Sequence, residues 1–273
     1  MLLHSLFIFV VLLVLPVPLP SIGLKGDTMK LKYTTIPLHE LMQAVESRPV
    51  QLQMPFSIPL RNSYYGLRHG QSTANVEGII SSDPVVGSLR HGLTDLGRTQ
   101  ARNAALPLIK LIGKEAFAKN GVVFLTSNFT RARETAYECY DEIKTILGLL
   151  PTTSAVIDIK NDLRERYFGK LDAQDLLFYN RVWPIDSEDG NNERDGVESV
   201  RAVCERIAGL VKQLEAQHSS KHIVFTSHAD TLQITQMLLA GKDARKFYLY
   251  RLGNGEVRDM STLLAPPVEI IYK

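Results

Sequence analysis

The segment YYGLRHGQSTANVEG, residues 64–78, places an arginine, a histidine and a glycine directly after an apolar, β-prone run. The run from Ser63 to Leu67 predicts a strand, and the polar, flexible residues that follow predict a loop at its end. In a parallel sheet, ligand sites gather at the carboxyl ends of the strands, where loops and helix N-termini converge. The segment therefore predicts a ligand site beside Arg68 and His69 if the sheet is parallel.

The rest of the chain supports a parallel sheet, because short apolar runs alternate with long amphipathic stretches. Further strands are predicted at residues 122–126, 155–159 and 223–227, and helices at 94–113 (with Thr94 as N-cap), 130–149, 197–217 and 230–239. A succession of strand and helix packs as a mostly parallel sheet with helices on both faces. The predicted fold is a three-layer α/β/α sandwich that spans residues 63–273 as one domain.

The composition narrows the class of function. A chain of 273 residues with 45% hydrophobic residues is long and apolar enough to form a packed core. Its formal net charge of +2 is too small to predict binding to nucleic acid or to an anionic membrane surface. Cys139 and Cys204 have no metal-ligand spacing, so we predict two buried thiols rather than a disulfide or a zinc site. Because the net charge is so small, any anion site must be formed by a few positively charged side chains grouped in one place.

The first 62 residues differ in kind from the rest of the chain. Residues 6–15 form an unbroken apolar run that is too short for a membrane-spanning helix, which needs about twenty residues. Together with Ser21 and Gly23, the run is typical of a signal peptide, although no Lys or Arg precedes it and Met29 is an alternative start. Two interpretations stay open for residues 1–23, a signal peptide or an apolar extension, and in both a connector follows over 24–62.

The compartment depends on that choice. A signal peptide predicts the secretory pathway or the extracellular space, and its absence predicts the cytoplasm; membrane contact is expected only if the apolar segment is retained. The sequon Asn128-Phe129-Thr130 counts against secretion, because it lies beside Arg131, where a glycan would crowd an anion site.

Charged or polar side chains follow each predicted strand. In chain order these are Arg68 and His69, then Ser127 and Arg131, then Arg164, Glu165 and Arg166, and finally His228. Two guanidinium groups can neutralise a phosphoryl dianion, and a neutral imidazole can attack phosphorus. A second, protonated imidazole could stabilise charge on the equatorial oxygens, and a carboxylic acid could protonate the leaving alkoxide. This set predicts phosphoryl transfer that needs no metal or other cofactor.

The motif LRHGQSTAN resembles the signature of the histidine phosphatase superfamily, also called the phosphoglycerate mutase-like family. The family's later blocks follow in their usual order: LTDLGRTQA (93–101), TSNFTRARETA (126–136), LRERYFGKLD (163–172), GVES (196–199) with Arg206 after it, and VFTSHADTLQ (224–233). Ordered blocks over residues 63–233 are far more specific than any one of them. The resemblance implies a phosphoglycerate mutase-like fold in a superfamily that contains phosphatases and mutases, and the phosphatase branch is favoured for the reason given below.

The resemblance also implies a role for each residue at a motif position. His69 would be the nucleophile that becomes a phosphohistidine, and Glu165 would be the proton donor. The residues that would hold the phosphate are Arg68, Gly70 (through its backbone), Asn75, Arg131 and His228. Gly70 would let the backbone approach a phosphate that the two arginines neutralise, and no metal ligand is implied.

Glu165 has alternatives. Arg164 and Arg166 flank it, so the three side chains could form an ion-pair group on the surface. Asp162 and Asp172 are neighbouring carboxyl groups that could serve as proton donor instead.

Other residues near the motifs are predicted to serve structure. Ser72, Glu198 and Ser199 are expected at helix caps, and Arg133 on a solvated helix face. The histidines outside motif positions, predicted to lie on the surface or in loops, are His4, His39, His91, His218 and His222.

Three functions remain open. The first is a phosphomonoesterase that acts on a small phosphorylated substrate through a phosphohistidine. The second is a mutase similar to the bisphosphoglycerate-dependent enzymes, which carry a longer basic, proline-rich segment after the glutamate block; here residues 179–199 are acidic and lack it. The third is an inactive phosphate-binding or scaffold domain. The complete set of charged residues favours an enzyme, and the acidic segment favours the phosphatase.

Substrate preference is expected to depend on the loops at residues 76–90 and 178–196. The second loop carries five acidic residues, which would repel highly charged anions if they face the site. These residues are Asp186, Glu188, Asp189, Glu193 and Asp195. If they do face the site, these residues favour a simple phosphate monoester as the substrate.

Overall fold

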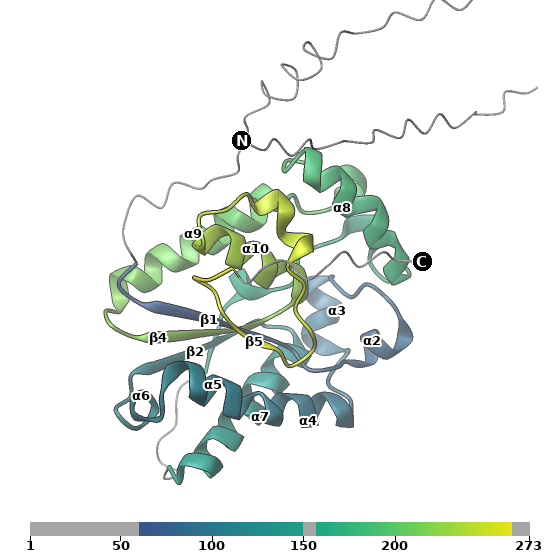
Figure 1. The fold of residues 1–273 in the computed structure, drawn as a ribbon. Helices are drawn as coiled ribbons and strands as arrows, with labels where there is room; N and C mark the ends of the chain where they lie inside the picture. Colours follow the sequence, from purple (N-terminus) through teal and green to yellow (C-terminus); the bar gives the residue numbers. More distant parts are fainter. Residues whose placement is uncertain (1–59, 150–156, 264–273) are drawn as a thin grey trace, which may run out of the picture. The chain divides into compact units, whose positions relative to one another are not determined.

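The computed structural model describes residues 60–149 and 157–263, which contain a five-stranded sheet in the order β3-β2-β4-β1-β5 (Figure 1). The strands are β1 (Ser63–Arg68), β2 (Val122–Thr126), β3 (Asp158–Ile159), β4 (His222–Ser227) and β5 (Val257–Asp259). Strands β1 to β4 run parallel, and β5 pairs antiparallel with β1. The predicted mostly parallel α/β sheet is confirmed.

Helices cover both faces of the sheet, as a parallel sheet requires (Figure 1). One layer holds α4 (Asp95–Asn103), α5 (Ala105–Ile112), α6 (Lys114–Ala118) and α7 (Thr130–Leu147). The other holds α9 (Val200–Gln217) and α10 (Ala229–Leu239), which pack against each other and, through α10, against β1 and β4. These are the three layers that the alternating pattern predicts.

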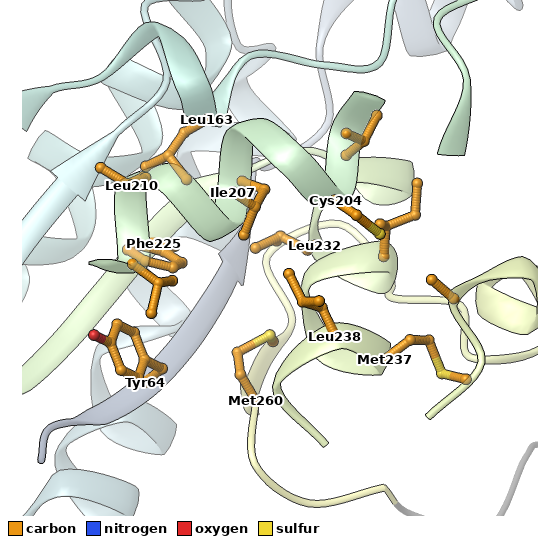
Figure 2. Packing of buried hydrophobic residues seen from close by; sticks show 14 of the residues in the cluster. Tyr64, Leu163, Cys204, Ile207, Leu210, Phe225, Leu232, Met237, Leu238 and Met260 are labelled. Atoms are coloured by element: carbon orange, nitrogen blue, oxygen red, sulfur yellow. The ribbon is translucent and has the colours of Figure 1, made fainter. Parts of the chain in front are cut away.

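The alternation of side chains along each strand divides the core into two halves. Tyr64 and Phe225 point to the α9 and α10 side, where they join Ile207 and Leu232 (Figure 2). Their neighbour along the strand, Tyr65, joins the core under α5 and α7. Successive residues of a strand point to opposite faces, so an unbroken apolar strand supplies both cores at once.

The first long helix differs from the prediction. Thr94 is the expected N-cap and accepts a hydrogen bond from the Gly97 N–H at 3.0 Å. The predicted single helix is, however, two helices that meet at Ala104. Pro107 explains the break, because it has no N–H to donate to the carbonyl of Asn103.

The other predicted elements hold with small shifts at their ends. Helix α7 ends at Leu147 because Gly148 adopts the left-handed conformation. Helix α9 starts at Val200 because Ser199 caps it, as predicted, by accepting from the Ala202 N–H. The third strand is only Asp158–Ile159 within the described residues, and residues 155–156 of the prediction lie outside them.

The two segments predicted as loops contain helices. These are α2 (Thr73–Glu77), α3 (Pro84–Leu89) and α8 (Tyr179–Glu188). Helix α3 has a recognisable start, with Asp83 as N-cap and Pro84 in the first turn. Helix α8 was not predicted from the sequence because its buried face carries an acidic residue, Asp186, which pairs with Arg166. Only a tertiary ion pair makes such a residue compatible with a core-facing position.

Short 3-10 segments complete the described structure. They are Asn161–Leu163, Gly169–Leu171, Leu176–Phe178, Arg194–Gly196 and Ala244–Leu249. The predictions for residues 1–23 and for the connector up to residue 59 lie outside the described residues. Within 60–149 and 157–263, no helix has the length and apolar character needed to cross a membrane.

Candidate active site

A pocket of about 300 Å³ lies at the carboxyl ends of the strands. Of the residues predicted for the site, it is lined by Arg68, His69, Asn75, Arg131 and Glu165. Arg68 ends β1, and Arg131 lies in the first turn of α7. The parallel sheet thus brings together side chains that are far apart in the chain.

His69 is 3% exposed and is held by two hydrogen bonds. Its Nδ1 lies 2.7 Å from the carbonyl oxygen of Gly70, and its Nε2 lies 3.1 Å from Nε of Arg131. A carbonyl only accepts and a guanidinium only donates, so Nδ1 carries the hydrogen and Nε2 carries the lone pair. Burial, then the charges of Arg131 and Arg68, hold the His69 pKa well below its usual value. The imidazole is therefore neutral, with a nucleophilic Nε2.

The two arginines are fixed by backbone contacts. Arg131 donates from Nη2 to the carbonyl oxygen of Ser81 at 2.8 Å, and its guanidinium lies 4.9 Å from the centre of the Phe129 ring. Arg68 donates from Nη1 to the carbonyl oxygen of Leu252 at 2.5 Å. Burial lowers the pKa of Arg131 to about 10, which still leaves it charged at neutral pH. Both groups can therefore present positive charge to an anion in the pocket.

His228 lies beside His69, with 5.1 Å between the ring centres. Its Nε2 is 2.9 Å from the hydroxyl oxygen of Ser127, and its buried Nδ1 has no hydrogen-bond partner within the described residues. Burial, then Arg131 and His69, hold the His228 pKa well below its usual value. The charges of the surrounding protein residues thus favour the neutral form, whereas the predicted protonated imidazole is one that lies beside a bound phosphate. A phosphoryl dianion would act in the opposite direction.

Gly70 serves a different purpose from the predicted one. Its N–H donates to Oγ1 of Thr135 at 3.0 Å, so this donor is already used. A Cβ at Gly70 would lie 2.2 Å from the carbonyl oxygen of Gly97, in the first turn of α4. The glycine is therefore required because helix α4 packs directly on this backbone, and Gly70 is not among the residues that line the pocket.

Asn75 lines the pocket but also closes a helix cap. Its Oδ1 accepts from the Ser72 N–H at 3.0 Å, while the Ser72 hydroxyl accepts from the Asn75 N–H at 3.3 Å. The predicted capping role of Ser72 is confirmed by this reciprocal pair. Asn254 donates to the same Oδ1 at 3.3 Å, so the amide nitrogen of Asn75 is the atom left for a ligand.

Glu165 is 6% exposed and accepts a hydrogen bond from the Arg166 N–H at 2.9 Å. The guanidinium groups on either side are engaged elsewhere, that of Arg164 by Glu198 and that of Arg166 by Asp186. The alternative of a surface ion-pair group is therefore wrong. Glu198 is an ion-pair partner rather than a helix cap.

The two alternative carboxyl groups are placed differently from Glu165. Asp172 accepts from the N–H and the hydroxyl of Ser82 at 2.6 and 2.7 Å. The backbone carbonyl of Asp162 accepts from Arg206. Neither residue is among those that line the pocket in the described part of the chain, which leaves Glu165 as the better placed of the three.

The profile of the histidine phosphatase superfamily, branch 1, matches residues 65–262. The chain belongs to the histidine phosphatase superfamily. The resemblance in the motifs is thereby confirmed, and membership of this superfamily supports an enzyme with phosphatase activity. A search of curated protein sequences finds no match to the chain.

Solved structures with the same fold are distant in sequence. A mycobacterial glucosyl-3-phosphoglycerate phosphatase in complex with VO3 is 22% identical, with 71% of this chain and 90% of that chain covered and a TM-score of 0.52. The alpha-ribazole phosphatase of Shigella flexneri is 23% identical (71% and 88% covered, TM-score 0.51). A phosphoserine phosphatase mutant of Entamoeba histolytica in complex with phosphoserine is 20% identical (72% and 88%, TM-score 0.52). These likenesses confirm the phosphoglycerate mutase-like fold.

A second carboxyl group, Asp230, lines the pocket of this histidine phosphatase and was not predicted. It is 2% exposed, accepts from Nε1 of Trp183 at 3.2 Å and lies 3.6 Å from Nη1 of Arg166. Burial, then the charge of Glu165, raises its pKa to about 7 in spite of Arg166. Its position in the sequence could have indicated a place in the site, because Asp230 follows His228 by two residues in the first turn of a helix.

The raised pKa of Asp230 predicts a pH-dependent stability. Between the ordinary value of 3.8 and about 7, the folded protein keeps a proton that the unfolded chain has lost. The contribution of Asp230 to the free energy of unfolding therefore falls as the pH rises through this window. Asp230→Asn cannot ionise, so its free energy of unfolding relative to the parent should rise from pH 4 to pH 8 in urea titrations.

Asp95→Asn, at an exposed carboxyl in the first turn of α4, is the matched control and should show no such trend. An equal difference between Asp230→Asn and the parent at both pH values would contradict the raised pKa.

The five acidic residues of the 178–196 segment do not face the site. Asp186 is fully buried against Arg166, and none of the five lines the pocket in the described structure. The condition on which they would favour a simple monoester is therefore not met.

The remaining predictions concern residues outside the pocket. Both cysteines are buried and free, as predicted. Nδ1 of His222 lies within hydrogen-bond distance of the Tyr65 hydroxyl, at 3.1 Å, and Nδ1 of His91 lies 2.8 Å from the Ser81 hydroxyl. Arg133 is half-buried and binds the carbonyl of Asn128, so its face of α7 is not simply solvated. Within the described residues, no group of three His, Cys, Asp or Glu side chains is arranged to hold a metal ion.

Proposed function

We propose that the protein is a metal-independent phosphomonoesterase that acts through a phosphohistidine at His69. The observation that carries the proposal is the Nε2 lone pair of a neutral His69, directed at Arg131 and placed in a pocket that Arg68 and Glu165 also line. A neutral imidazole is a nucleophile, and the two guanidinium groups supply the charge that a phosphoryl dianion requires.

The proposed first step transfers the phosphoryl group to the enzyme. Nε of Arg131 exchanges its contact with Nε2 of His69 for a contact with a phosphoryl oxygen, which frees the lone pair. Nε2 then forms a bond to phosphorus as the bond from phosphorus to the ester oxygen breaks. A proton from Glu165 neutralises the leaving alkoxide, and the alcohol departs.

The proposed second step returns the enzyme to its starting state. Glu165, now ionised, takes a proton from water, and the oxygen of that water attacks phosphorus. The bond from phosphorus to Nε2 breaks, inorganic phosphate is released, and the neutral imidazole is restored. His228 lies beside His69, and its Nδ1 is unpartnered within the described residues. The charge of the phosphoryl dianion would raise the His228 pKa, so that the imidazole can take up a proton from solvent and stabilise the transferred group.

The substrate is proposed to be a small phosphate monoester. A pocket of about 300 Å³ is at the small end of ligand sites. Phosphatases of the same fold are named for glucosyl-3-phosphoglycerate, alpha-ribazole phosphate and phosphoserine. A panel of these three classes of monoester is therefore the first set of substrates to assay.

The test of the function uses the purified protein with a generic aryl phosphate and a metal chelator. We expect release of phosphate and a phosphoenzyme that survives quenching in alkaline denaturant and is lost on treatment with acid, as a phosphohistidine would be. Turnover that depends on a bisphosphorylated primer would instead support the mutase, and the absence of both turnover and phosphoenzyme on the panel would support an inactive phosphate-binding domain.

Glu165→Gln should be most harmful for substrates with poor leaving groups. The amide cannot donate a full proton, so we expect kcat/KM for an alkyl phosphate to fall by about 10²- to 10⁴-fold. The loss should be much smaller for p-nitrophenyl phosphate, whose leaving group needs little protonation. Glu205→Gln, on the exposed side of α9, is the matched control and should be neutral for both substrates. Equal losses on the two substrates would argue against a proton donor.

A further inference from the structure

Tyr179, the first residue of α8, lines the pocket and is held in place by aromatic contacts. Its ring stacks on that of Trp183 with 4.8 Å between centres and a 12° angle between planes. The ring of Phe168 meets it edge-on at 4.9 Å and 81°. These contacts are apolar, so they fix the ring and leave the hydroxyl free to point at a ligand.

The hydroxyl lies among the charged groups of the site. Burial, followed by the charges of Asp230 and Glu165, raises the pKa of Tyr179 far above its ordinary value, and Arg68 and Arg131 act in the opposite direction. The phenol therefore keeps its proton throughout the physiological range and can only be a neutral donor or acceptor. It is also close enough to both guanidinium groups to act on their pKa values in turn.

The Tyr179 hydroxyl makes no hydrogen bond with any residue of the described ranges, even though two carboxyl groups act on it electrostatically. Tyr179 is only partly buried, and its hydroxyl is not among the fully buried polar atoms that lack a partner in the described residues, so it can be reached from the pocket that it lines. The free donor therefore points to an acceptor that the ligand brings.

We propose that the Tyr179 hydroxyl donates a hydrogen bond to a non-bridging oxygen of the substrate's phosphoryl group. Arg68 and Arg131 would hold that group, and its oxygens have lone pairs to spare for a third donor. The proposal deepens the proposed phosphatase and rests on its assignment of the pocket to a phosphoryl group. It makes Tyr179 a substrate-binding residue on a helix that covers the site.

The test is Tyr179→Phe, which keeps the stacked ring and removes one donor. A hydrogen bond to a charged group corresponds to roughly a 10- to 100-fold change in binding. We expect kcat/KM for an aryl phosphate to fall by about this factor. The Kd of inorganic phosphate, measured by isothermal titration calorimetry, should rise by the same factor, while the Tm stays unchanged. Tyr137→Phe, at a half-exposed position on α7, is the matched control.

The outcomes separate this proposal from the proposed function. The proposed role of Tyr179 would be overturned if parent and Tyr179→Phe agreed within twofold in both kcat/KM for the aryl phosphate and Kd for inorganic phosphate. A fall in kcat/KM with an unchanged Kd for phosphate would overturn it as well. Failure of the parent to bind phosphate at all would overturn it too. If the parent binds phosphate more tightly than Tyr179→Phe but hydrolyses no ester, the role of Tyr179 stands and the phosphatase function fails.

Discussion

His69→Ala should lose turnover by about 10⁴-fold or more and should form no phosphoenzyme. The variant removes the atom to which the phosphoryl group is proposed to bind, and loss of a covalent nucleophile is among the most damaging changes to an enzyme. Steady-state assays with an aryl phosphate measure the first effect, and trapping of the phosphoenzyme in alkaline denaturant measures the second. Circular dichroism should show the parent fold.

Stability is expected to change far less than activity in this variant. Alanine leaves the Gly70 carbonyl and one Arg131 donor without their His69 partner, which costs roughly 1–3 kcal/mol. His222→Ala is the matched control, since His222 is half-buried and contacts the Tyr65 hydroxyl away from the pocket. We expect that variant to keep its turnover. Normal turnover by His69→Ala would remove the basis of the proposed mechanism.

Gly70→Ala should destabilise the fold by about 2–4 kcal/mol, measured as the free energy of unfolding in urea. The added Cβ would lie 2.2 Å from the Gly97 carbonyl oxygen, which is backbone and cannot turn aside as a side chain would. Helix α4 must therefore shift, and forced overpacking of this kind is costly. Gly97→Ala should have a similar effect, because its Cβ would lie 2.0 Å from the carbonyl oxygen of Gln71.

Gly209→Ala provides the control for these glycine variants. Gly209 lies in the middle of α9, and apart from its chain neighbours and the nearby backbone of its own helix, no atom lies within 4 Å of the place that an alanine methyl group would take. Alanine there should be neutral or should stabilise by about 0.5–1 kcal/mol, because it has the higher helix propensity. If Gly70→Ala and Gly209→Ala unfolded at the same urea concentration, the close approach of α4 would not be a structural requirement.

Elements with a strong local pattern were predicted well. The strand at Val122–Thr126 has the predicted bounds, because an unbroken apolar run of that length admits few other structures. The helix from Thr130 was correct at its start, and Gly148 marks its end. Helix α8 was missed because its buried face carries Asp186, which only the distant Arg166 makes compatible with burial.

The candidate site was partly predictable for a related reason. Residues at the ends of parallel strands meet at one edge of a sheet, so the sequence alone places Arg68 and His69 near one another and near the start of α7. It does not place Tyr179 and Asp230, since their presence in the pocket depends on how α8 and α10 pack over that edge.

The order of apolar runs, helix caps and turn residues was enough to predict a parallel α/β sandwich and to place His69, Arg68 and Arg131 as candidates for one phosphate site, because these patterns act over a few residues. Which atoms are free to act was settled only by packing between distant segments. The Gly70 N–H is taken by Thr135, and the Tyr179 hydroxyl has no partner in the described structure. Hydrogen bonds of this kind join residues that come together only when helices cross, and no local pattern encodes that crossing.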